Sequence, residues 1–377
     1  MPTRFRLFTK RFFIYAHIAV VFFFLLSCLV PLLNPQKWWW ITFLGLGFPI
    51  LLLLVIFFMI LWLVFKPRLA WISVIALLIA FKNITVFFAF NNPGTFTNKK
   101  GADTLRIASW NVARFIEIKK NNNKGSQTRL KMMELIKQQQ ADILCLQEFQ
   151  TSFNPEYYDN ISYIKQELGY PFYYFSYDED GGNHFYSTVI FSMYPIIDSG
   201  IVHYPRPSIP EALIHADIKL NDDTIRVYST HLQSLQLKKT DYENINELTK
   251  GDRVIDNSRS IFSKLSRGSA LRSTQAEVIK MLVKDSPYPV LFAGDLNDVP
   301  NSYTYFTVKG NMQDAFLKKG FGMGRTFTGL APTLRIDYIF ADKDFKIIQF
   351  NRLVKNLSDH YMLVADVKLS AGRKRNE

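Results

Sequence analysis

Three long apolar runs in the first ninety residues constrain this chain more than any other feature. They cover residues 12–33, 41–65 and 69–90, and each contains at least 22 residues. A helix that spans a bilayer needs about 20 consecutive apolar residues. Three consecutive tryptophans, at residues 38–40, stand between the first two runs, where a membrane-interface belt is expected. The sequence therefore predicts a membrane domain over residues 1–92 with three transmembrane helices.

A cleaved signal peptide is the alternative explanation of the first run. The run follows a basic start, as a signal peptide would, but it is longer than a signal-peptide core and no small-x-small cleavage site follows it. Residues 25–28 loosely resemble a lipoprotein processing box, yet the second position is wrong and apolar sequence continues beyond it. We therefore expect the first run to remain in the protein as a membrane helix.

The formal net charge of +13 is unevenly distributed along the chain. Residues 1–100 hold ten basic residues and no acidic one, whereas the remaining 277 residues hold 35 basic and 32 acidic residues. The excess of positive charge therefore does not indicate a nucleic-acid-binding surface. It lies in the apolar part of the chain, where basic residues indicate the membrane topology. Basic residues precede the first run and lie between the second and third, which predicts a cytoplasmic N-terminus. Everything after residue 90 is then expected outside the cytoplasm, in a multi-pass protein of a bacterial-type inner membrane.

Lys82 lies near the middle of the third run. A charge inside the membrane is a candidate functional residue, but no acidic residue in the three runs is available to pair with it. A shorter or tilted span that lets Lys82 reach the interface is the alternative. The two cysteines, Cys28 in the first run and Cys145 in a strand-like run, are not expected to form a disulfide.

The rest of the chain is typical of one α/β domain. A polar linker over residues 93–103 leads into a domain over 104–370, and a short basic tail follows at 371–377. Strand-like runs alternate with helical spacing, which favours packed sheets covered by helices. Strands are expected at residues 105–111, 142–148, 187–192, 212–220, 224–231, 290–294, 336–341 and 362–369, and helices at 129–140 and 269–283.

Five polar clusters each follow directly on an apolar strand run. They are Ser109-Trp110-Asn111, Gln147-Glu148, Ser229-Thr230-His231, Gly294-Asp295-Leu296-Asn297 and Ser358-Asp359-His360. Strands that end at one edge of a sheet would bring these groups into one cleft. Carboxylates and amides with few nitrogens suit Mg²⁺ or Mn²⁺ rather than zinc, and the two histidines suit proton transfer. Together these groups could supply the cation site, the general base and the general acid that attack of water on a phosphoester requires.

Each cluster taken singly has a structural explanation as well. Asn111 at a strand end is typical of a turn or a helix cap, and Glu148 of a surface position or salt bridge. His231 alone would suit a packed or solvent-exposed position. Residues 298–302 have turn and helix-start chemistry. The hypothesis of a catalytic site rests on the order of the clusters along the chain and on their occurring together.

That order, with one further motif at residues 335–339, closely resembles the endonuclease/exonuclease/phosphatase superfamily with the DNase I-like fold. The resemblance covers residues 105–369 and suggests a membrane-anchored, bacterial-type member. It implies a four-layered α/β sandwich, two β-sheets with outer helices, and divalent-cation-dependent hydrolysis of phosphoesters. The motifs are Ser109-Trp110-Asn111-Val112, Leu146-Gln147-Glu148, Thr230-His231-Leu232, Gly294-Asp295-Leu296-Asn297, Arg335-Ile336-Asp337-Tyr338-Ile339 and Ser358-Asp359-His360.

The resemblance also implies roles for single residues. Glu148 is similar to the principal ligand of the metal, Mg²⁺ or Mn²⁺, with Asn111 and Asp359 completing the metal and phosphate site. His360 is similar to the histidine that activates water, and Asp337 to the carboxylate that orients it.

The remaining implied roles concern the nucleophile and the phosphate. Asp295 and Asn297 resemble the pair that positions the nucleophile and holds a phosphate oxygen. His231 resembles the second histidine of the DNase I and sphingomyelinase branches, which assists the leaving group or the phosphoryl oxygens. The apurinic-endonuclease branch lacks this histidine, which argues against a base-excision role. The substrate-binding set is thus Asn297, Asn111 and His231.

The substrate is left open by the sequence, because one fold of this kind serves many phosphoesters. The first hypothesis is a membrane-anchored phosphodiesterase or phosphatase acting on lipid head groups or other envelope phosphoesters, with the lipid bilayer as its partner. The second is a non-specific nuclease acting on nucleic acid, and the third is a catalytically silent membrane scaffold. The segment 233–268 suits either a basic rim of the cleft or a solvated mixed-charge helix. The sequence identifies no protein partner.

Overall fold

The structure is a computed structural model of the chain. It describes residues 2–92, 94–120, 127–205, 212–235, 254–329 and 331–370. The chain forms two compact units. The first comprises Met1–Phe87, Leu235–Ser273 and Val299–Phe306, and the second comprises Phe88–Ser234, Thr274–Asp298 and Thr307–Glu377. The first unit thus takes in two segments that the sequence division at residues 92 and 104 had assigned to the second.

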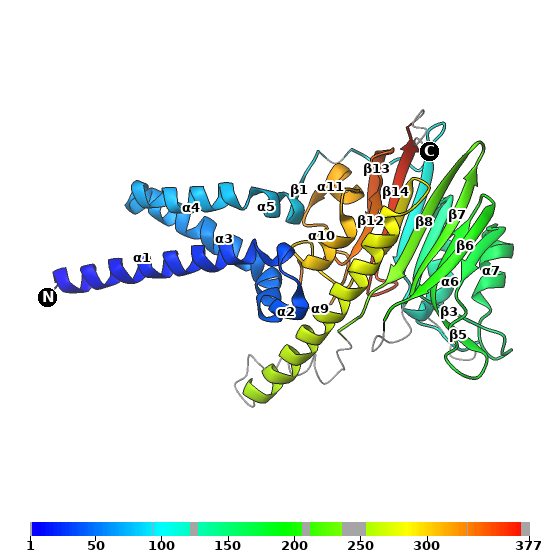
Figure 1. Ribbon diagram of the computed structural model, residues 1–377, viewed down its shortest axis with the longest axis horizontal. Coiled ribbons are helices and arrows are strands. Elements are labelled where there is room, and N and C mark those ends of the chain that lie inside the picture. Colours follow the sequence, from blue (N-terminus) through cyan, green and yellow to red (C-terminus); the bar gives the residue numbers. More distant parts are fainter. Residues whose placement is uncertain are drawn as a thin grey trace. The chain divides into compact units, whose positions relative to one another are not determined.

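Apolar helices make up most of the first unit. Its elements are α1 (Pro2–Ser27), η1 (Val30–Leu32), α2 (Pro35–Trp38), η2 (Trp39–Ile41), α3 (Thr42–Phe65), α4 (Pro67–Ile79), α5 (Phe81–Phe87) and the first part of α9 (Val254–Lys284). The helices α1, α3 and α4 lie side by side (Figure 1). A buried polar contact joins them: the indole of Trp62 donates to Nδ1 of His17 at 3.0 Å, and Nε2 of His17 lies 2.8 Å from Oγ of Ser73.

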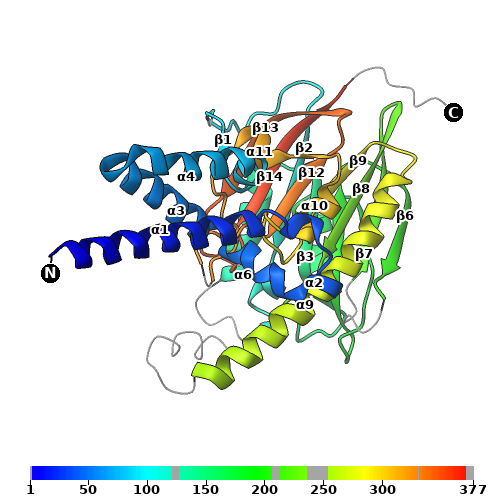
Figure 2. The ribbon, with the colours of Figure 1, turned by 60° about the vertical axis from the view of Figure 1, so that its left-hand side comes forward.

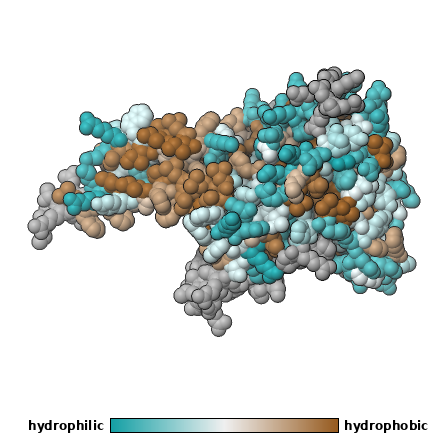
Figure 3. Space-filling view, in the orientation of Figure 1, coloured by the Kyte–Doolittle hydropathy of each residue, from teal (hydrophilic) through white to brown (hydrophobic). Residues whose placement is uncertain are grey.

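Within the described residues, two helical stretches are long and apolar enough to cross a membrane, Leu7–Leu32 and Pro35–Phe65. Their outward surfaces are apolar, as the brown atoms over these helices show (Figure 3). The predicted third span is not one straight helix, because α4 and α5 meet at an angle of 65°. The helices α4 and α5 form a third span only if the two together cross the membrane once.

Lys82 lies in α5, beyond this bend. Its side chain is exposed, and its Nζ stands 5.6 Å from the ring centre of Phe306. Lys82 therefore lies outside the two helical stretches that are long and apolar enough to cross a membrane. The function of Lys82 stays untested.

The second unit is built on two six-stranded sheets lying face to face (Figure 1, Figure 2). The first has the order β10-β12-β9-β8-β7-β6: Gln313–Asp314, Asp337–Ala341, Val290–Asp295, Asp223–His231, Ala212–Leu220 and Ile196–His203. The second has the order β13-β14-β2-β3-β5-β4: Phe345–Leu353, Met362–Leu369, Leu105–Asn111, Ile143–Ser152, His184–Ser192 and Phe172–Phe175. The two-residue strands β1 (Ala89–Phe90) and β11 (Phe321–Gly322) pair separately.

Both sheets are mixed, which sets the edges at which strands end. The pairs β2–β3 and β8–β9 are parallel, and the other pairs are antiparallel. The core between the sheets consists of small and branched apolar side chains from both, including Ile107, Ile143, Ile214, Val227 and Ile339. Central strands such as β3 begin as continuous apolar runs because both their faces are covered.

Helices cover the outer faces, which completes the four predicted layers. On the second sheet lie α6 (Thr128–Gln139), with Met132 and Ile136 in its buried face, and α7 (Asn160–Glu167). The end of α9 lies on the first sheet, where Tyr228 donates to the carbonyl of Leu282. The remaining helices are η3 (Ala113–Phe115), α11 (Ala315–Lys319) and α10 (Tyr303–Lys309), whose residues up to Phe306 belong to the first unit. The predicted four-layered sandwich is therefore confirmed, although β4, β6, β13, α7, α10 and α11 had not been predicted.

The predicted linker is in part fixed to the second unit. Arg106 is fully buried and donates to both oxygens of Asp366 and to the backbone carbonyls of Thr97 and Asn98. The segment around residues 97–98 is therefore held by hydrogen bonds. The predicted basic tail, residues 371–377, lies outside the described residues, as does much of the predicted segment 233–268.

Candidate active site

The ends of parallel strands bring the predicted polar clusters together. In the first sheet β8 and β9 end side by side, with His231 opposite Asp295, and Asp337 at the start of β12 also pairs with Asp295. In the second sheet β2 ends at Asn111. The glycine before Asp295 is required by packing, because a Cβ on Gly294 would collide with the backbone of β8.

A bulge in β3 places Glu148. The pairing of β3 with β5 shifts its register between Leu146 and Phe149, and Glu148 has a φ of +49°. A positive φ is uncommon for a residue with a side chain and marks a local strain that the surrounding fold must support. The bulge takes Glu148 out of the regular alternation of the strand, and its side chain is 28% exposed.

Asn111 links the two carboxylates of the site. Its Nδ2 donates to Oε1 of Glu148 at 3.2 Å and to Oδ2 of Asp295 at 3.1 Å. Nε2 of His231 lies 3.8 Å from Oε1 of Glu148 and 3.6 Å from Oδ2 of Asp295. Four predicted site residues, from both sheets of the unit, therefore converge within a few ångströms.

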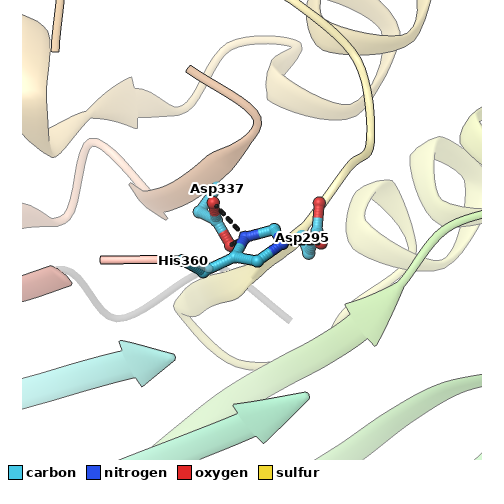
Figure 4. Close-up of side chains that lie close together, drawn as sticks. All are labelled: Asp295, Asp337 and His360. Carbon is cyan, nitrogen blue, oxygen red and sulfur yellow. Dashed lines mark hydrogen bonds and ion pairs between the residues drawn. The ribbon is translucent and has the colours of Figure 1, made fainter. Parts of the chain in front are cut away.

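His360 lies between two aspartates (Figure 4). Its Nδ1 is 2.9 Å from Oδ2 of Asp337, and its Nε2 is 3.7 Å from Oδ2 of Asp295. Burial disfavours the charged imidazole, but the negative charges of Asp337 and Asp295 outweigh burial and raise the pKa of His360 to about 10. The hydrogen bond to Asp337 fixes the proton on Nδ1 and leaves Nε2 toward Asp295.

Asp295 is fully buried at the centre of these contacts. Burial, reinforced by the charge of Asp337, raises the pKa of Asp295 to about 6. The backbone N–H of Asn297 donates to Oδ1 of Asp295 at 2.8 Å, and the Asn297 side chain donates to the carbonyl of Leu232. Asn297 has a φ of +50°, so the loop turns sharply after Asp295.

Asp359 is the predicted site residue that the structure leaves apart. Its side chain is exposed and accepts a hydrogen bond from Ser358 at 3.2 Å. In the described part of the chain no hydrogen bond joins it to Glu148 or Asn111. Its negative charge contributes to the raised pKa of His360, which places it within electrostatic reach of the site.

The donor set fits a hard divalent cation. Ligand atoms of Asp295, Asp337 and His360 lie within 4.8 Å of one another. Asp337 and Nδ1 of His360 are already joined by a hydrogen bond, so the partly exposed Glu148 is the better candidate for a ligand. The Oδ1 of Asn111 accepts from the backbone N–H of Ala113 at 3.1 Å and has a second lone pair for a cation. A cation beside these carboxylates would stabilise the charged form of Asp295, whose pKa is raised by burial and by the charge of Asp337.

Thr326 supports the site and was not predicted from the sequence. Its Oγ1 accepts hydrogen bonds from the backbone N–H groups of Ile336 and Asp337, at 2.9 and 3.1 Å. The residue lies in a short irregular segment without a recognisable motif, so no sequence signal marks it. Two predicted motif members also act as supports: Trp110 donates to the carbonyl of His360, and Ser358 donates to the carbonyl of Asn111.

Two protein families match the chain, one over residues 108–360 and one over residues 10–87. The family described as Endonuclease/Exonuclease/phosphatase matches residues 108–360, a range that contains every site residue named above. The chain belongs to the endonuclease/exonuclease/phosphatase family. Its members are hydrolases that act on phosphoesters. Residues 10–87 match a second family, described as a domain of unknown function. No curated protein matches the chain in sequence.

One solved structure of an endonuclease/exonuclease/phosphatase shares the fold of this chain, and two further solved structures are similar to it. The family member from Beutenbergia cavernae DSM 12333 is 17% identical, with a TM-score of 0.50 over 71% of this chain and 72% of that chain. Humanized D. rerio TDP2 is 19% identical, with a TM-score of 0.49 over 71% and 100%. The human Nocturnin catalytic domain is 18% identical, with a TM-score of 0.49 over 71% and 94%. At these identities the likeness concerns the fold alone.

Proposed function

We propose that the chain is a membrane-anchored, divalent-cation-dependent phosphoester hydrolase that acts outside the cytoplasm on lipid head groups or other envelope phosphoesters. One observation carries the proposal: Glu148, Asp295, Asn111, His231 and His360 converge in a chain whose first unit is made of apolar helices. Family membership supplies the reaction class. In this proposal the substrate lies at the lipid bilayer that anchors the first unit.

The cation would be held by Glu148 and Asn111, with Asp359 completing the site. Bound Mg²⁺ or Mn²⁺ supplies charge neutralisation to the phosphate and polarises it for attack. Glu148 and Asn111 are already held in place by the hydrogen bond between them, so little reorganisation is needed to present two oxygen ligands.

In the proposed reaction, His360, His231 and Asp295 take part in proton transfer. Asp337 holds Nδ1 of His360, so proton transfer at His360 takes place at Nε2, which faces Asp295. Asp295 and Asn297 orient the attacking water and a phosphate oxygen. His231, whose Nε2 faces both Glu148 and Asp295, donates to the phosphoryl oxygens or the leaving group.

The segment that follows the Asp295–Asn297 loop supports a position of the active site outside the cytoplasm. Val299–Phe306 contacts the end of α1 through Ser27 and the start of α3 through Gly45. The connection between α1 and α3 lies opposite the basic N-terminus if α1 crosses the membrane, so the positive-inside rule assigns it to the outer side.

The function is tested with the full-length protein in detergent or nanodiscs, because a fragment without residues 1–87 would divide the first compact unit. We expect hydrolysis of bis-p-nitrophenyl phosphate with Mg²⁺ or Mn²⁺ and none after chelation. The His360→Ala variant should lose at least about 100-fold in kcat, because general acid–base groups contribute that much. A loss below about tenfold would contradict the mechanism.

A substrate panel separates the three hypotheses. Phosphatidylinositol, sphingomyelin, inositol phosphates and plasmid DNA are offered to the same preparation at equal phosphate concentration. Preferred hydrolysis of bilayer phospholipids supports the proposal, and preferred cleavage of DNA supports the nuclease alternative. No hydrolysis of any compound supports the silent scaffold.

Topology is tested with fusions to the C-terminus. Alkaline phosphatase fused after Glu377 should be active only if the catalytic unit is exported, and green fluorescent protein at the same point should then be dark. A fluorescent and phosphatase-inactive pair would place the catalytic unit in the cytoplasm.

A further inference from the structure

The segment that follows the catalytic loop belongs to the helical unit. This docking segment, Val299–Phe306, comes directly after residues 295–298, which carry Asp295 and Asn297. A single peptide bond, between Asp298 and Val299, separates the part of the loop assigned to the second unit from the part assigned to the first. The two halves of one short loop therefore belong to different units.

Asn301 fixes the docking segment among the helices through both ends of its side-chain amide. Its Oδ1 accepts from Nδ2 of Asn83 at 2.7 Å, and its own Nδ2 donates to the carbonyl of Ser27 at 3.1 Å. Asn301 is 2% exposed and Asn83 is 9% exposed. Both side-chain amides are thus shielded from water. Breaking their hydrogen bond would leave a buried polar group unsatisfied, which costs free energy, so the pair favours one position of the docking segment against α5.

Three further contacts hold the docking segment to other parts of the helical unit. Gly45 of α3 lies so close that a Cβ there would be 2.7 Å from the carbonyl oxygen of Asn301. Nδ2 of Asn34 lies 3.4 Å from the hydroxyl of Tyr303, and the ammonium of Lys82 faces the ring of Phe306. The segment is therefore held by α1, α3, α5 and the connection between α1 and α2.

The other side of the loop is attached within the second unit. The hydroxyl of Tyr338 donates to the carbonyl of Asp298 at 2.9 Å, and Asn297 donates to the carbonyl of Leu232. The part of the loop up to Asp298 is thus held within the second unit, and the part from Val299 onward within the helical unit.

We propose that Asn83 and Asn301 are positioning residues for catalysis: their hydrogen bond anchors the docking segment in the helical unit and so sets the position of the Asp295–Asn297 loop. The inference rests on the proposed hydrolase function. The helices of the first unit then do more than attach the enzyme to the membrane. They hold one end of its catalytic loop, and a displacement of about 1 Å at such a loop costs up to about 100-fold in rate.

The test is a double-mutant cycle in the full-length protein, with bis-p-nitrophenyl phosphate and saturating Mg²⁺. The variants are Asn83→Ala, Asn301→Ala and the double variant. We expect each single variant to lose roughly 10- to 100-fold in kcat with KM within about twofold, because the loop acts on the attacking water. The double variant should lose no more than the worse single variant, because both remove the same anchor.

Ser73→Ala is the matched control. Ser73 is fully buried in the helical unit and contacts His17, but it does not touch the docking segment. Its removal should lower the melting temperature and leave kcat unchanged. If Asn301→Ala does not fold, Asn83→Ser is used, since it removes the amide donor and keeps a small polar group.

Hydrogen exchange distinguishes failure of this inference from failure of the proposed function. Faster exchange at backbone amides of residues 296–302 in Asn83→Ala, with unchanged exchange in β2 and β3, supports the anchor even if no substrate is hydrolysed. An active wild type with kcat in Asn83→Ala and Asn301→Ala within twofold of its own would overturn the inference. So would unchanged exchange in this loop.

Discussion

Asp337 accepts a hydrogen bond from Nδ1 of His360, with its two oxygens at 2.9 and 3.1 Å from that nitrogen. Both residues are buried; Asp337 begins β12 of the first sheet, and His360 lies two residues before β14 of the second sheet. The pair therefore fixes the orientation of the imidazole and the nitrogen that carries its proton. In the proposed mechanism, proton transfer takes place at the opposite nitrogen, Nε2, whose position this bond sets.

Replacing Asp337 by Asn should lower kcat by about 10²- to 10⁴-fold, because the imidazole loses both its orienting charge and its preferred tautomer. The melting temperature should change little, since the amide keeps the size of the carboxylate. The control is Asp222→Asn, in the exposed turn between β7 and β8, which should retain full activity. A loss of less than tenfold in Asp337→Asn would show that His360 does not need its partner.

Replacing Glu148 by Gln should weaken activation by the cation. The Mg²⁺ concentration for half-maximal activity should rise by at least about tenfold, because even residues that only support a ligand contribute 10- to 100-fold to metal affinity. Activity should return in part at high Mg²⁺. Glu134→Gln, on the exposed face of α6, is the matched control. An unchanged Mg²⁺ requirement in Glu148→Gln would remove Glu148 from the proposed ligand set.

Replacing Thr326 by Val should destabilise the start of β12. The valine leaves two buried backbone N–H groups, those of Ile336 and Asp337, without an acceptor, which costs about 1–3 kcal/mol of unfolding free energy per group. Thr326→Ser keeps the oxygen and should stay close to the wild type. Melting curves and kcat of both variants check this. Equal melting temperatures for the valine and serine variants would contradict it.

Acidification should destabilise the second unit in part through His215. Burial, together with the positive charge of Arg226, lowers the pKa of His215 below its usual value, although Asp217 and Asp198 act in the opposite direction. Below a pH of about 6.5 the unfolded chain then binds more protons at this residue than the folded one, so stability is lost as the pH falls.

The check is the change in melting temperature between pH 7.5 and 5.5. His215→Gln removes the titration, so its melting temperature should fall less than that of the wild type over this interval. An equal or larger fall in the variant would contradict the contribution of His215.

The sequence predicted the ends of β2, β8 and β9 to within one residue, because the polar clusters follow apolar runs that the fold must bury, whereas β3 continues four residues beyond its expected end at Glu148, to Ser152. Asn111, His231 and Asp295 end strands that lie where periodicity and composition place them. Edge strand β6 was missed, because Gly200 and Asp198 interrupt its apolar pattern and most of its residues are only half-buried. Parallel pairing of β8 with β9 then aligns their polar ends without further information.

Other features depend on tertiary contacts that one sequence does not express. The bend between α4 and α5 falls inside a continuous apolar run, so hydropathy alone reads it as one span. Asn301 has the chemistry of a turn residue, and its role emerges only because Asn83, more than two hundred residues earlier, lies against it. Asp359 has the expected motif neighbours but is exposed, so its ligand role stays a prediction.

The bulge in β3 has a consequence for anyone transferring this site to another scaffold. Glu148 owes its place to one surplus residue in a strand, so the length of the chain at that point matters as much as the identity of the side chain. Deleting Gln147 would leave Glu148 as the single residue opposite Thr188 in a regular ladder, with Phe149 still paired with Ser187, and so would take Glu148 out of the bulge. A design that copied all the polar side chains onto an unbroken strand would therefore not reproduce the position of Glu148, the carboxylate proposed to bind the metal, even with every residue type retained.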